Sequence, residues 1–192
     1  RSLAAFDAER AVVANAGSPG FIYKTADGGK TWKAVLRDMR PAFFIDALAF
    51  FDDKRGLALG DPIDGSFLFL ITDDGGETWT PASADALPKP LAGEAFFAAS
   101  NGSLVTTPGG RVWIGSGGGP QARLFTSRDK GRTFTAEIVP LAAGKPTRGV
   151  FGLAFRSPRY GLAVGGDYQE TSFREGIAAR GAAGGAGWSP FG

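Results

Sequence analysis

The chain of 192 residues contains no cysteine and no histidine, and it has only one methionine and three tyrosines. The lack of cysteine excludes disulfide bonds, thiol catalysis and zinc-thiolate sites. The lack of histidine excludes Ser-His-Asp catalysis and histidine metal sites. No apolar run approaches the roughly 20 residues of a membrane span, and none resembles a signal peptide. The net charge is only +2, and no basic stripe is interleaved with aromatics, so the sequence predicts no nucleic-acid partner.

Glycine, by contrast, is abundant. The 30 glycines are about twice the usual share, whereas the 43% hydrophobic fraction is ordinary for a globular domain. This combination is typical of a chain that turns every several residues.

One stretch, TADGGKTW at residues 25–32, resembles the end of a phosphate-binding P-loop. A P-loop needs a glycine five residues before the glycine that precedes its lysine, and Lys24 occupies that place. The pattern recurs further along as TDDGGETW and SRDKGRTF, with Glu77 and Arg132 in the position of the lysine. Because a carboxylate cannot replace a phosphate ligand, the sequence predicts neither a nucleotide nor another cofactor here.

The three copies share a Ser or Thr, an Asp two residues later, and then Gly, Thr and an aromatic residue. They comprise Thr25, Asp27, Gly29, Thr31 and Trp32; Thr72, Asp74, Gly76, Thr78 and Trp79; and Ser127, Asp129, Gly131, Thr133 and Phe134. We expect the Asp to accept hydrogen bonds from backbone N–H groups just downstream, and the Gly to adopt the positive φ that the turn needs. The Ser or Thr ties the incoming strand to the turn, and the aromatic ring enters the core. Each copy lies between two strand-like runs, so its predicted role is structural, as the turn of a β-hairpin.

The turns also define a repeat. Asp27, Asp74 and Asp129 are 47 and 55 residues apart, close to the roughly 40 to 50 residues of a four-stranded propeller blade. Upstream of each turn lie two further strand-like runs, as in DALAFFDDKRGLALGD and VFGLAFRSPRYGLAVGGD. Four antiparallel strands per repeat predict an all-β fold, a β-propeller. The predicted blades span about residues 2–40, 41–85 and 92–140, with a partial blade at 148–168.

Residues 169–192 break the pattern, because they carry no fourth turn motif and are rich in Gly, Ala and Arg. Their low β-propensity predicts a disordered or loosely packed tail. The chain would then hold three blades and half of a fourth, whereas propellers close with roughly four to eight. We therefore expect a fragment or frameshifted product of a longer propeller, whose open strand edges favour self-association.

The three turn motifs resemble the Asp-box, or BNR repeat, of sialidases, sortilin-like receptors and photosystem II stability and assembly factors. The run AFFIDALAFFDDKRGLALGDPIDGSFLFLITDDGGETW, with LAGEAFFAAS, VWIGSGGG and GLAVGGDY, most closely resembles bacterial proteins related to the plant photosystem II assembly factor. The resemblance covers residues 2–168 and implies a propeller, but it is nearly silent about chemistry because the box occurs in enzymes and non-enzymes alike. Since such proteins are usually exported, it also implies a periplasmic or extracellular location.

In propellers, ligands usually meet the face formed by the loops that join strand two to three and strand four to the next blade. The Asp-boxes join strand three to four and lie on the opposite side, which removes their aspartates from any catalytic role. The predicted ligand face draws on Asp61, Asp64, Asp167, Tyr168, Arg37, Arg40 and Arg148. Acidic and basic loops on one face suit a protein or glycan ligand, and ordinary surface charge is the alternative.

Two functions from different classes follow. The first is a non-catalytic binding or assembly-scaffold propeller. The second is a sialidase-like glycoside hydrolase, which needs an arginine cluster, a Tyr activated by Glu, and an Asp acid. Only Tyr168 falls on the predicted face, and no Glu is paired with it in the sequence, so binding is favoured and no catalytic residue is predicted. Asp61, Asp64, Asp73 and Asp74 crowd one segment but match no calcium-binding spacing, so no metal site is predicted.

Overall fold

The computed structural model describes residues 2–15, 17–83, 85–98, 101–157, 160–182 and 187–191. This part of the chain forms four antiparallel sheets of four strands each. Sheet 1 contains β1 (Ser2–Ala5), β2 (Ala11–Ala14), β3 (Gly20–Thr25) and β4 (Lys33–Asp38). Sheet 2 contains β5 (Ile45–Phe50), β6 (Gly56–Ile63), β7 (Ser66–Thr72) and β8 (Thr80–Pro81). Sheet 3 contains β9 (Leu104–Thr106), β10 (Val112–Gly115), β11 (Ala122–Ser127) and β12 (Thr135–Val139). Sheet 4 contains β13 (Arg148–Ser157), β14 (Tyr160–Asp167), β15 (Ala178–Ala182) and β16 (Gly187–Pro190).

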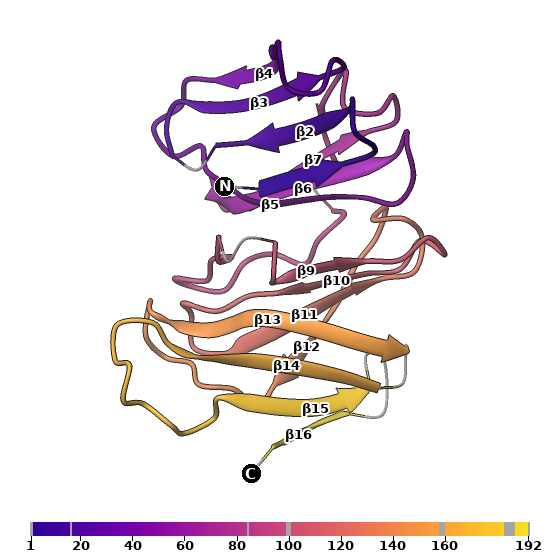
Figure 1. The fold of residues 1–192 in the computed structure, drawn as a ribbon. Coiled ribbons are helices and arrows are strands. Elements are labelled where there is room, and N and C mark those ends of the chain that lie inside the picture. The colour runs from indigo at the N-terminus through magenta and orange to yellow at the C-terminus, as the bar shows by residue number, and fades with distance from the viewer. Residues whose placement is uncertain are drawn as a thin grey trace.

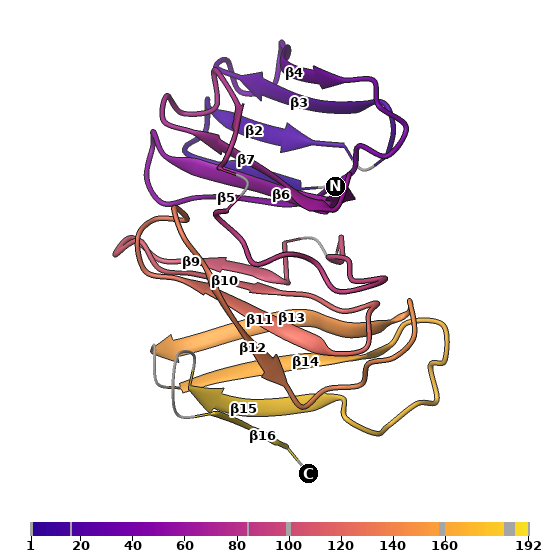
Figure 2. The ribbon, with the colours of Figure 1, turned by 180° about the vertical axis from the view of Figure 1, so that it is seen from behind.

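The sheets follow one another as an arc of propeller blades. Within each sheet the strands lie in chain order, as the repeat predicts. The first strands β1, β5, β9 and β13 contact one another in succession, and they run through the middle of the molecule in Figure 1. In this view sheets 1 and 2 occupy the upper half of the molecule and sheets 3 and 4 the lower half. The view from behind in Figure 2 shows the same order.

The core consists of three apolar layers between successive sheets. Val12 and Ile22 of sheet 1 pack with Ile45 and Leu70 of sheet 2. The second layer joins Leu57 and Phe69 of sheet 2 to Ile114 and Phe125 of sheet 3, and the third joins Trp113 and Leu124 of sheet 3 to Val150 and Ala163 of sheet 4. Fully burying a side chain of this kind stabilises the fold by about 1.5 to 3 kcal/mol. Because a single sheet buries little by itself, the stacking of sheets holds the fold together.

The fourth sheet differs from the sequence-based expectation. The sequence predicts only a partial blade at residues 148–168. The structure instead contains a complete four-stranded sheet here, since β15 pairs with β14 and β16 pairs with β15. The small side chains that lower β-propensity here suit a crowded site, because a Cβ added to Gly181 would lie 2.8 Å from the Cα of Trp188. Trp188 packs on Phe155, and tertiary packing of this kind overrides local propensity. Residues 183–186 and 192 of the tail lie outside the described residues.

Candidate functional site

Each Asp-box is a turn closed by its own side chains. In the second box, the Thr72 hydroxyl donates to Asp74 Oδ1 at 2.8 Å and accepts the Gly76 N–H at 2.9 Å. Asp74 Oδ1 accepts the backbone N–H of Thr78 at 3.0 Å, and Asp74 Oδ2 accepts the Thr78 hydroxyl at 2.6 Å. These hydrogen bonds, from the Thr78 side chain above all, lower the pKa of Asp74 to about 2. The first and third boxes repeat the same four bonds.

The first box, which resembles a P-loop, has its backbone donors occupied. The Gly28 N–H donates to the Glu9 carbonyl at 2.9 Å, and the Gly29 N–H donates to the Thr25 hydroxyl at 3.0 Å. The Thr31 N–H donates to Asp27. A phosphate would have to displace these bonds, so the box is a structural turn.

The box aromatics do not all enter the core. Trp79 and Phe134 are each 8% exposed, whereas Trp32 is 42% exposed, so the expectation of a buried ring is wrong for Trp32. The difference depends on the position of each sheet in the arc. Trp79 packs in the layer between sheets 1 and 2, and Phe134 packs in the layer between sheets 2 and 3. Each ring therefore packs against the preceding sheet, and among the described residues no sheet precedes sheet 1.

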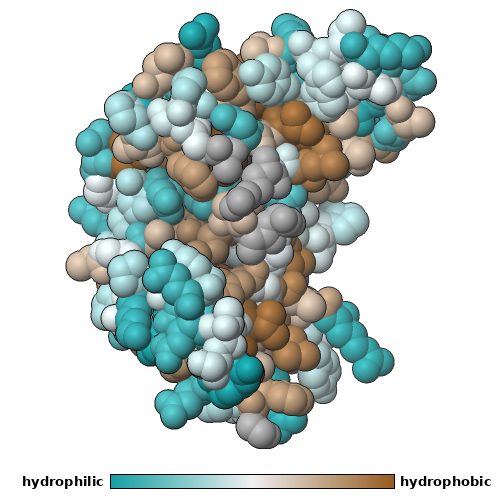
Figure 3. Space-filling model, turned by 60° about the vertical axis from the view of Figure 1, so that its left-hand side comes forward, coloured by the Kyte–Doolittle hydropathy of each residue, from teal (hydrophilic) through white to brown (hydrophobic). Residues whose placement is uncertain are grey.

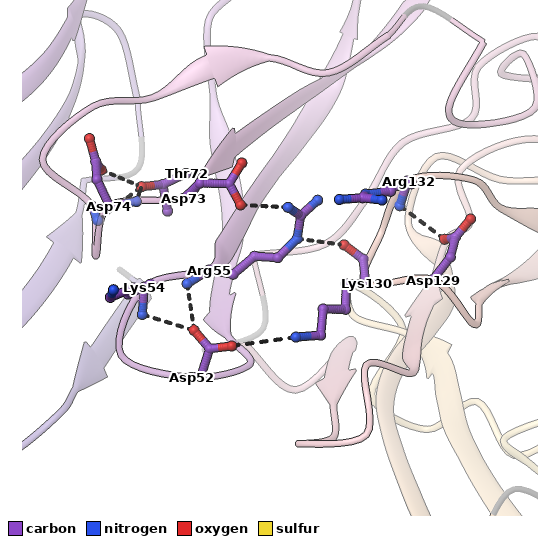
Figure 4. A network of polar contacts seen from close by, with 10 residues as sticks. Asp52, Lys54, Arg55, Thr72, Asp73, Asp74, Asp129, Lys130 and Arg132 are labelled. Atoms are coloured by element: carbon purple, nitrogen blue, oxygen red, sulfur yellow. Dashed lines mark hydrogen bonds and ion pairs between the residues drawn. The ribbon is translucent and has the colours of Figure 1, made fainter.

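The charges around the second and third boxes hold neighbouring sheets together. Arg55 forms an ion pair with Asp73 beside the second box, and its Nε donates to the Lys130 carbonyl in the third box at 3.3 Å. Lys130 in turn lies 3.6 Å from Asp52 of the β5–β6 hairpin. Figure 4 shows this network bridging sheets 2 and 3. The side chains of Asp73, Lys130 and Asp52 are about half exposed or more, and exposed ion pairs contribute only about 0 to 1 kcal/mol each, so the network adds little to stability.

On the side opposite the boxes, the structure brings together three predicted ligand-face residues, namely Arg148, Asp167 and Tyr168. Arg148 Nε donates to Asp167 Oδ2 at 3.0 Å. A hydrogen bond from the Thr147 side chain, together with this arginine, lowers the pKa of Asp167 to about 2. Tyr168 is 57% exposed, and Glu170 follows it on the same loop, 3.5 Å from Arg148 and 3.8 Å from Lys145.

Aromatic rings pack against this cluster. The Tyr168 ring lies 6.2 Å from that of Phe97 and 6.3 Å from that of Phe151, and these two rings meet edge to face at 4.9 Å. The Arg148 guanidinium sits 4.0 Å from the centre of the Phe173 ring. We call Phe97, Lys145, Arg148, Phe151, Asp167, Tyr168, Glu170 and Phe173 the mouth patch.

Arg37, Arg40 and Asp64 do not join the mouth patch. Arg37 stacks over Phe21 of sheet 1. Arg40 pairs with Asp38 at 2.7 Å, and this hydrogen-bonded partner raises the pKa of Arg40, with a smaller contribution from the Asp64 carboxylate. The three predicted arginines thus engage separate partners, and the arginine cluster that a sialidase needs is not formed by them.

Arg40 instead borders a groove along β7. The groove has a volume of about 220 Å³ and is lined by Arg40, Ile63, Ser66 to Leu70, Pro81 to Ser83, and Leu87 to Pro90. It exists because β8 contains only two residues and pairs with β7 only at Leu70 and Ile71. The Ala82 N–H still donates to the Phe69 carbonyl at 2.9 Å, whereas residues 66–68 of β7 pair with β6 and not with β8.

Asp61, the remaining predicted residue, is partly buried and interacts with a fully buried carboxylate, Asp46, that sequence reasoning missed. Its Oδ1 accepts the Phe96 N–H at 3.2 Å, and burial raises its pKa. Its neighbour Asp46 is 2% exposed, and Asp46 Oδ2 has no hydrogen-bond partner among the described residues. Burial, and secondarily the charge of Asp61, raises the pKa of Asp46 to about 8. No sequence motif marks this pair, because its burial arises from the packing of the sheets.

A second buried pair consists of Glu94 and Arg123. Arg123 Nε donates to Glu94 Oε1 at 2.7 Å, and the Ser116 hydroxyl donates to the same oxygen at 2.6 Å. Glu94 is 3% exposed, so its carboxylate is satisfied internally.

Within the described residues, no group of three or more His, Cys, Asp or Glu side chains is placed to hold a metal ion. That part of the chain also contains no helix long and apolar enough to cross a membrane.

The four sheets and three boxes define the chain as an all-β protein built of propeller blades with Asp-box turns. Residues 70–81 match the BNR/Asp-box repeat. No curated protein matches the sequence. Solved structures do match, and among them is YCF48 from Cyanidioschyzon merolae, with a TM-score of 0.54 and 20% identity over 98% of this chain and 57% of that chain. YCF48 has also been solved bound to a D1 peptide.

Two further structures show the same fold. A protein of unknown function from Dyadobacter fermentans has a TM-score of 0.55 and 21% identity, over 100% of this chain and 64% of that one. The GH74 enzyme of Niastella koreensis has a TM-score of 0.57 and 16% identity, over 98% of this chain and 29% of the enzyme. The chain thus spans less than two thirds of each of these three proteins. At such identities the likeness shows the fold alone.

Proposed function

We propose that this chain is a non-catalytic protein-binding module that contacts its partner through the mouth patch. The observation that carries the proposal is the exposed Tyr168 ring resting on Phe97 and Phe151 beside the Arg148–Asp167 ion pair. Tyr and Arg are enriched among the residues that dominate binding energy at protein interfaces. Lys145 and Glu170 place opposite charges at the rim, which suits a polar border around an aromatic centre.

The chemistry of the patch argues for binding over glycoside hydrolysis. A carboxylic acid that protonates a leaving group needs a raised pKa, whereas the pKa of Asp167 is lowered to about 2. A nucleophilic tyrosine needs an adjacent base, whereas the ring contacts of Tyr168 are with two phenylalanines. Asp167 is therefore suited to carrying a fixed negative charge, and Tyr168 to forming an aromatic contact surface.

The test selects peptides from a random phage-displayed library on the immobilised chain and measures the affinity of a selected peptide in solution. We expect Tyr168→Ala to weaken binding by about tenfold or more, because an interface anchor is worth at least about 1.4 kcal/mol. Tyr160→Ala is the matched control, since Tyr160 is 71% exposed at the start of β14, whereas Tyr168 follows the end of that strand, and it should leave the affinity unchanged.

Two results would overturn the proposal. One is a library that yields no binder, or only peptides that bind Tyr168→Ala as tightly as the parent. The other is turnover of a fluorogenic sialoside that disappears in Tyr168→Phe, which would establish the hydrolase alternative.

A further inference from the structure

The third strand of sheet 2 has an incomplete neighbour. β8 pairs with β7 at only two residues, Leu70 and Ile71. In sheets 1 and 3 the outer strand pairs with five residues of the third strand, over 20–24 and 122–126. Sheet 2 lies between sheets 1 and 3, and both of them pack on it. The short pairing therefore does not arise at an end of the arc.

The chain leaves the β7–β8 ladder at a turn. The Ala82 N–H donates to the Phe69 carbonyl, and the Ala86 N–H then donates to the Ser83 carbonyl, both at 2.9 Å. Because the backbone groups of successive residues in a strand point to opposite sides, the N–H and carbonyl of Phe67 point to the same side as the Phe69 carbonyl. β8 does not reach Phe67, and no described turn or loop gives it a backbone hydrogen bond. A donor and an acceptor of the sheet therefore face the groove along β7.

The groove beside Phe67 has the shape and the lining that a short extended segment needs. Its volume is about 220 Å³, and Ile63, Leu87, Pro88 and Pro90 contribute apolar walls. An added β-strand is bound by main-chain hydrogen bonds along the sheet edge, and pockets for its alternate side chains supply specificity. The beginning of β7 combines both features.

The charges of the lining indicate which kind of segment fits. Arg40 and Lys89 line the groove, and none of its described lining residues is an Asp or Glu. Arg40 is held by Asp38 at 2.7 Å. Lys89 is exposed and belongs to none of the ion pairs in the part of the chain that the structure describes. An acidic side chain of the occupant would thus meet an available cation.

The groove is distinct from the other surfaces of the molecule that could bind a partner. In Figure 3 the molecule has a C-shaped outline, and hydrophobic surface gathers along the hollow between its two arms. That hollow lies on the inner side of the C, whereas the groove accompanies β8, the outermost strand of sheet 2. None of the mouth-patch residues is among the described residues that line the groove.

We propose that a partner protein adds an extended, acidic segment to sheet 2 at the beginning of β7. The segment continues the line of β8, so that its backbone pairs with Phe67. Its apolar side chains contact Leu87 and Pro88, and a carboxylate pairs with Lys89. A strand suits this edge better than a helix does, because the backbone groups of a helix are already bonded within the helix.

The test selects peptides from a random phage-displayed library on the full chain carrying Tyr168→Ala, so that its outcome does not depend on the mouth patch. Phage that also bind the same chain with Lys89→Glu are removed first. We expect the remaining peptides to carry an acidic residue among apolar ones, and to bind the Lys89→Glu chain at least about tenfold more weakly. Lys30→Glu is the matched control, because Lys30 is an exposed lysine of the first box, and it should leave the affinity unchanged.

Two further measurements report on backbone pairing. N-methylation of the peptide amides, one at a time, should weaken binding about tenfold or more at alternate positions, because only alternate N–H groups of an added strand face β7. In the protein, nuclear magnetic resonance should show slower amide exchange at Phe67 when the peptide binds. The Leu68 amide, which faces β6, should exchange at the same rate with and without peptide.

The proposal is overturned if no peptide remains after the counter-selection. It is equally overturned if N-methylation weakens binding to the same extent at every position, or if exchange at Phe67 does not change. Dimerisation of the parent chain that slows exchange at Phe67 without any peptide would also overturn it, because a second copy would then occupy the groove.

Discussion

Asp74 shows how much of a box depends on one side chain, because it accepts hydrogen bonds from three groups of its own turn. Asp74→Ala removes their acceptor, and we expect a loss of about 1 to 3 kcal/mol in the free energy of unfolding. The pKa of about 2 lies below the ordinary value near 3.8. The contribution of Asp74 is therefore present above about pH 4 and is lost as the pH falls toward 2.

Urea unfolding at several pH values checks this prediction. The parent and Asp74→Ala should differ most at neutral pH and converge near pH 2. Asp73→Ala is the control on the neighbouring residue, whose partner is the Arg55 guanidinium rather than the turn. Equal stability of parent and Asp74→Ala at pH 7 would contradict the structural role of the boxes.

Asp46 has the opposite pH dependence. Its pKa, raised to about 8 by burial, means that the folded chain keeps a proton that the unfolded chain releases above about pH 4. The contribution of the protonated Asp46 carboxyl to the free energy of unfolding is therefore fully present below pH 4. It decreases as the pH rises toward 8, by at most about 1.4 kcal/mol per pH unit. We expect Asp46→Asn to be more stable than the parent at pH 8 by about 1 kcal/mol or more, and to differ little at pH 4.

Denaturant midpoints of the two proteins at pH 4 and pH 8 measure the effect. Asp64→Asn, at an exposed turn, is the control for removing one carboxylate from the surface. A parallel profile for Asp46→Asn and the parent would mean that Asp46 is ionised in the folded chain.

At the scale of strands and turns, the sequence predicts the features that depend on residues close together in the chain. Residues 70–81 contain the strand, box and following strand of a hairpin, and the box residues close that turn within a few positions of one another. The outer strands of sheet 4 are different, because Ala179 becomes fully buried only when β14 lies beside it and sheet 3 packs against sheet 4. The mouth patch also depends on residues that are far apart in the sequence. Arg148 and Asp167 can be assigned to one face from loop order, whereas Phe97 and Phe173 reach it from loops of unequal length that no motif marks.

Trp188→Ala tests whether β15 and β16 are packed as described. The Trp188 ring lies 6.1 Å from that of Phe155 and joins the apolar layer between sheets 3 and 4. We expect its loss to cost about 3 kcal/mol and to increase amide exchange at Ala178 to Gly181. Trp32→Ala is the matched control, because Trp32 is 42% exposed and belongs to sheet 1, and it should leave this exchange unchanged. If the tail is loosely packed, as its composition predicts, Trp188→Ala will melt like the parent.

At the scale of the whole molecule, contacts run from each sheet to the next, as β1 to β5, β5 to β9, and β9 and β10 to β13. Stability in such a stack approximates a sum of sheet and neighbour terms. The repeat therefore predicts the architecture, but it cannot say which copy of a repeated residue is covered. Leu57 and Leu162 occupy one motif, but only Leu57 is covered by a further sheet of the described residues.

The central layer between sheets 2 and 3 decides whether the arc unfolds as one unit. Phe125 is fully buried there and meets Phe67 and Phe96 edge to face, at 5.4 and 5.8 Å. Phe125→Ala should cost about 3 to 5 kcal/mol, and because this loss falls on the junction, it should separate the opening of sheets 1 and 2 from that of sheets 3 and 4. Hydrogen exchange followed by mass spectrometry would then give β3 and β14 different protection free energies, where the parent gives one. Phe21→Ala, in sheet 1 and outside the central layer, should leave the two values equal. A single shared value in Phe125→Ala would mean that coupling does not pass through the central layer, and that the first strands β5 and β9 alone join the two halves.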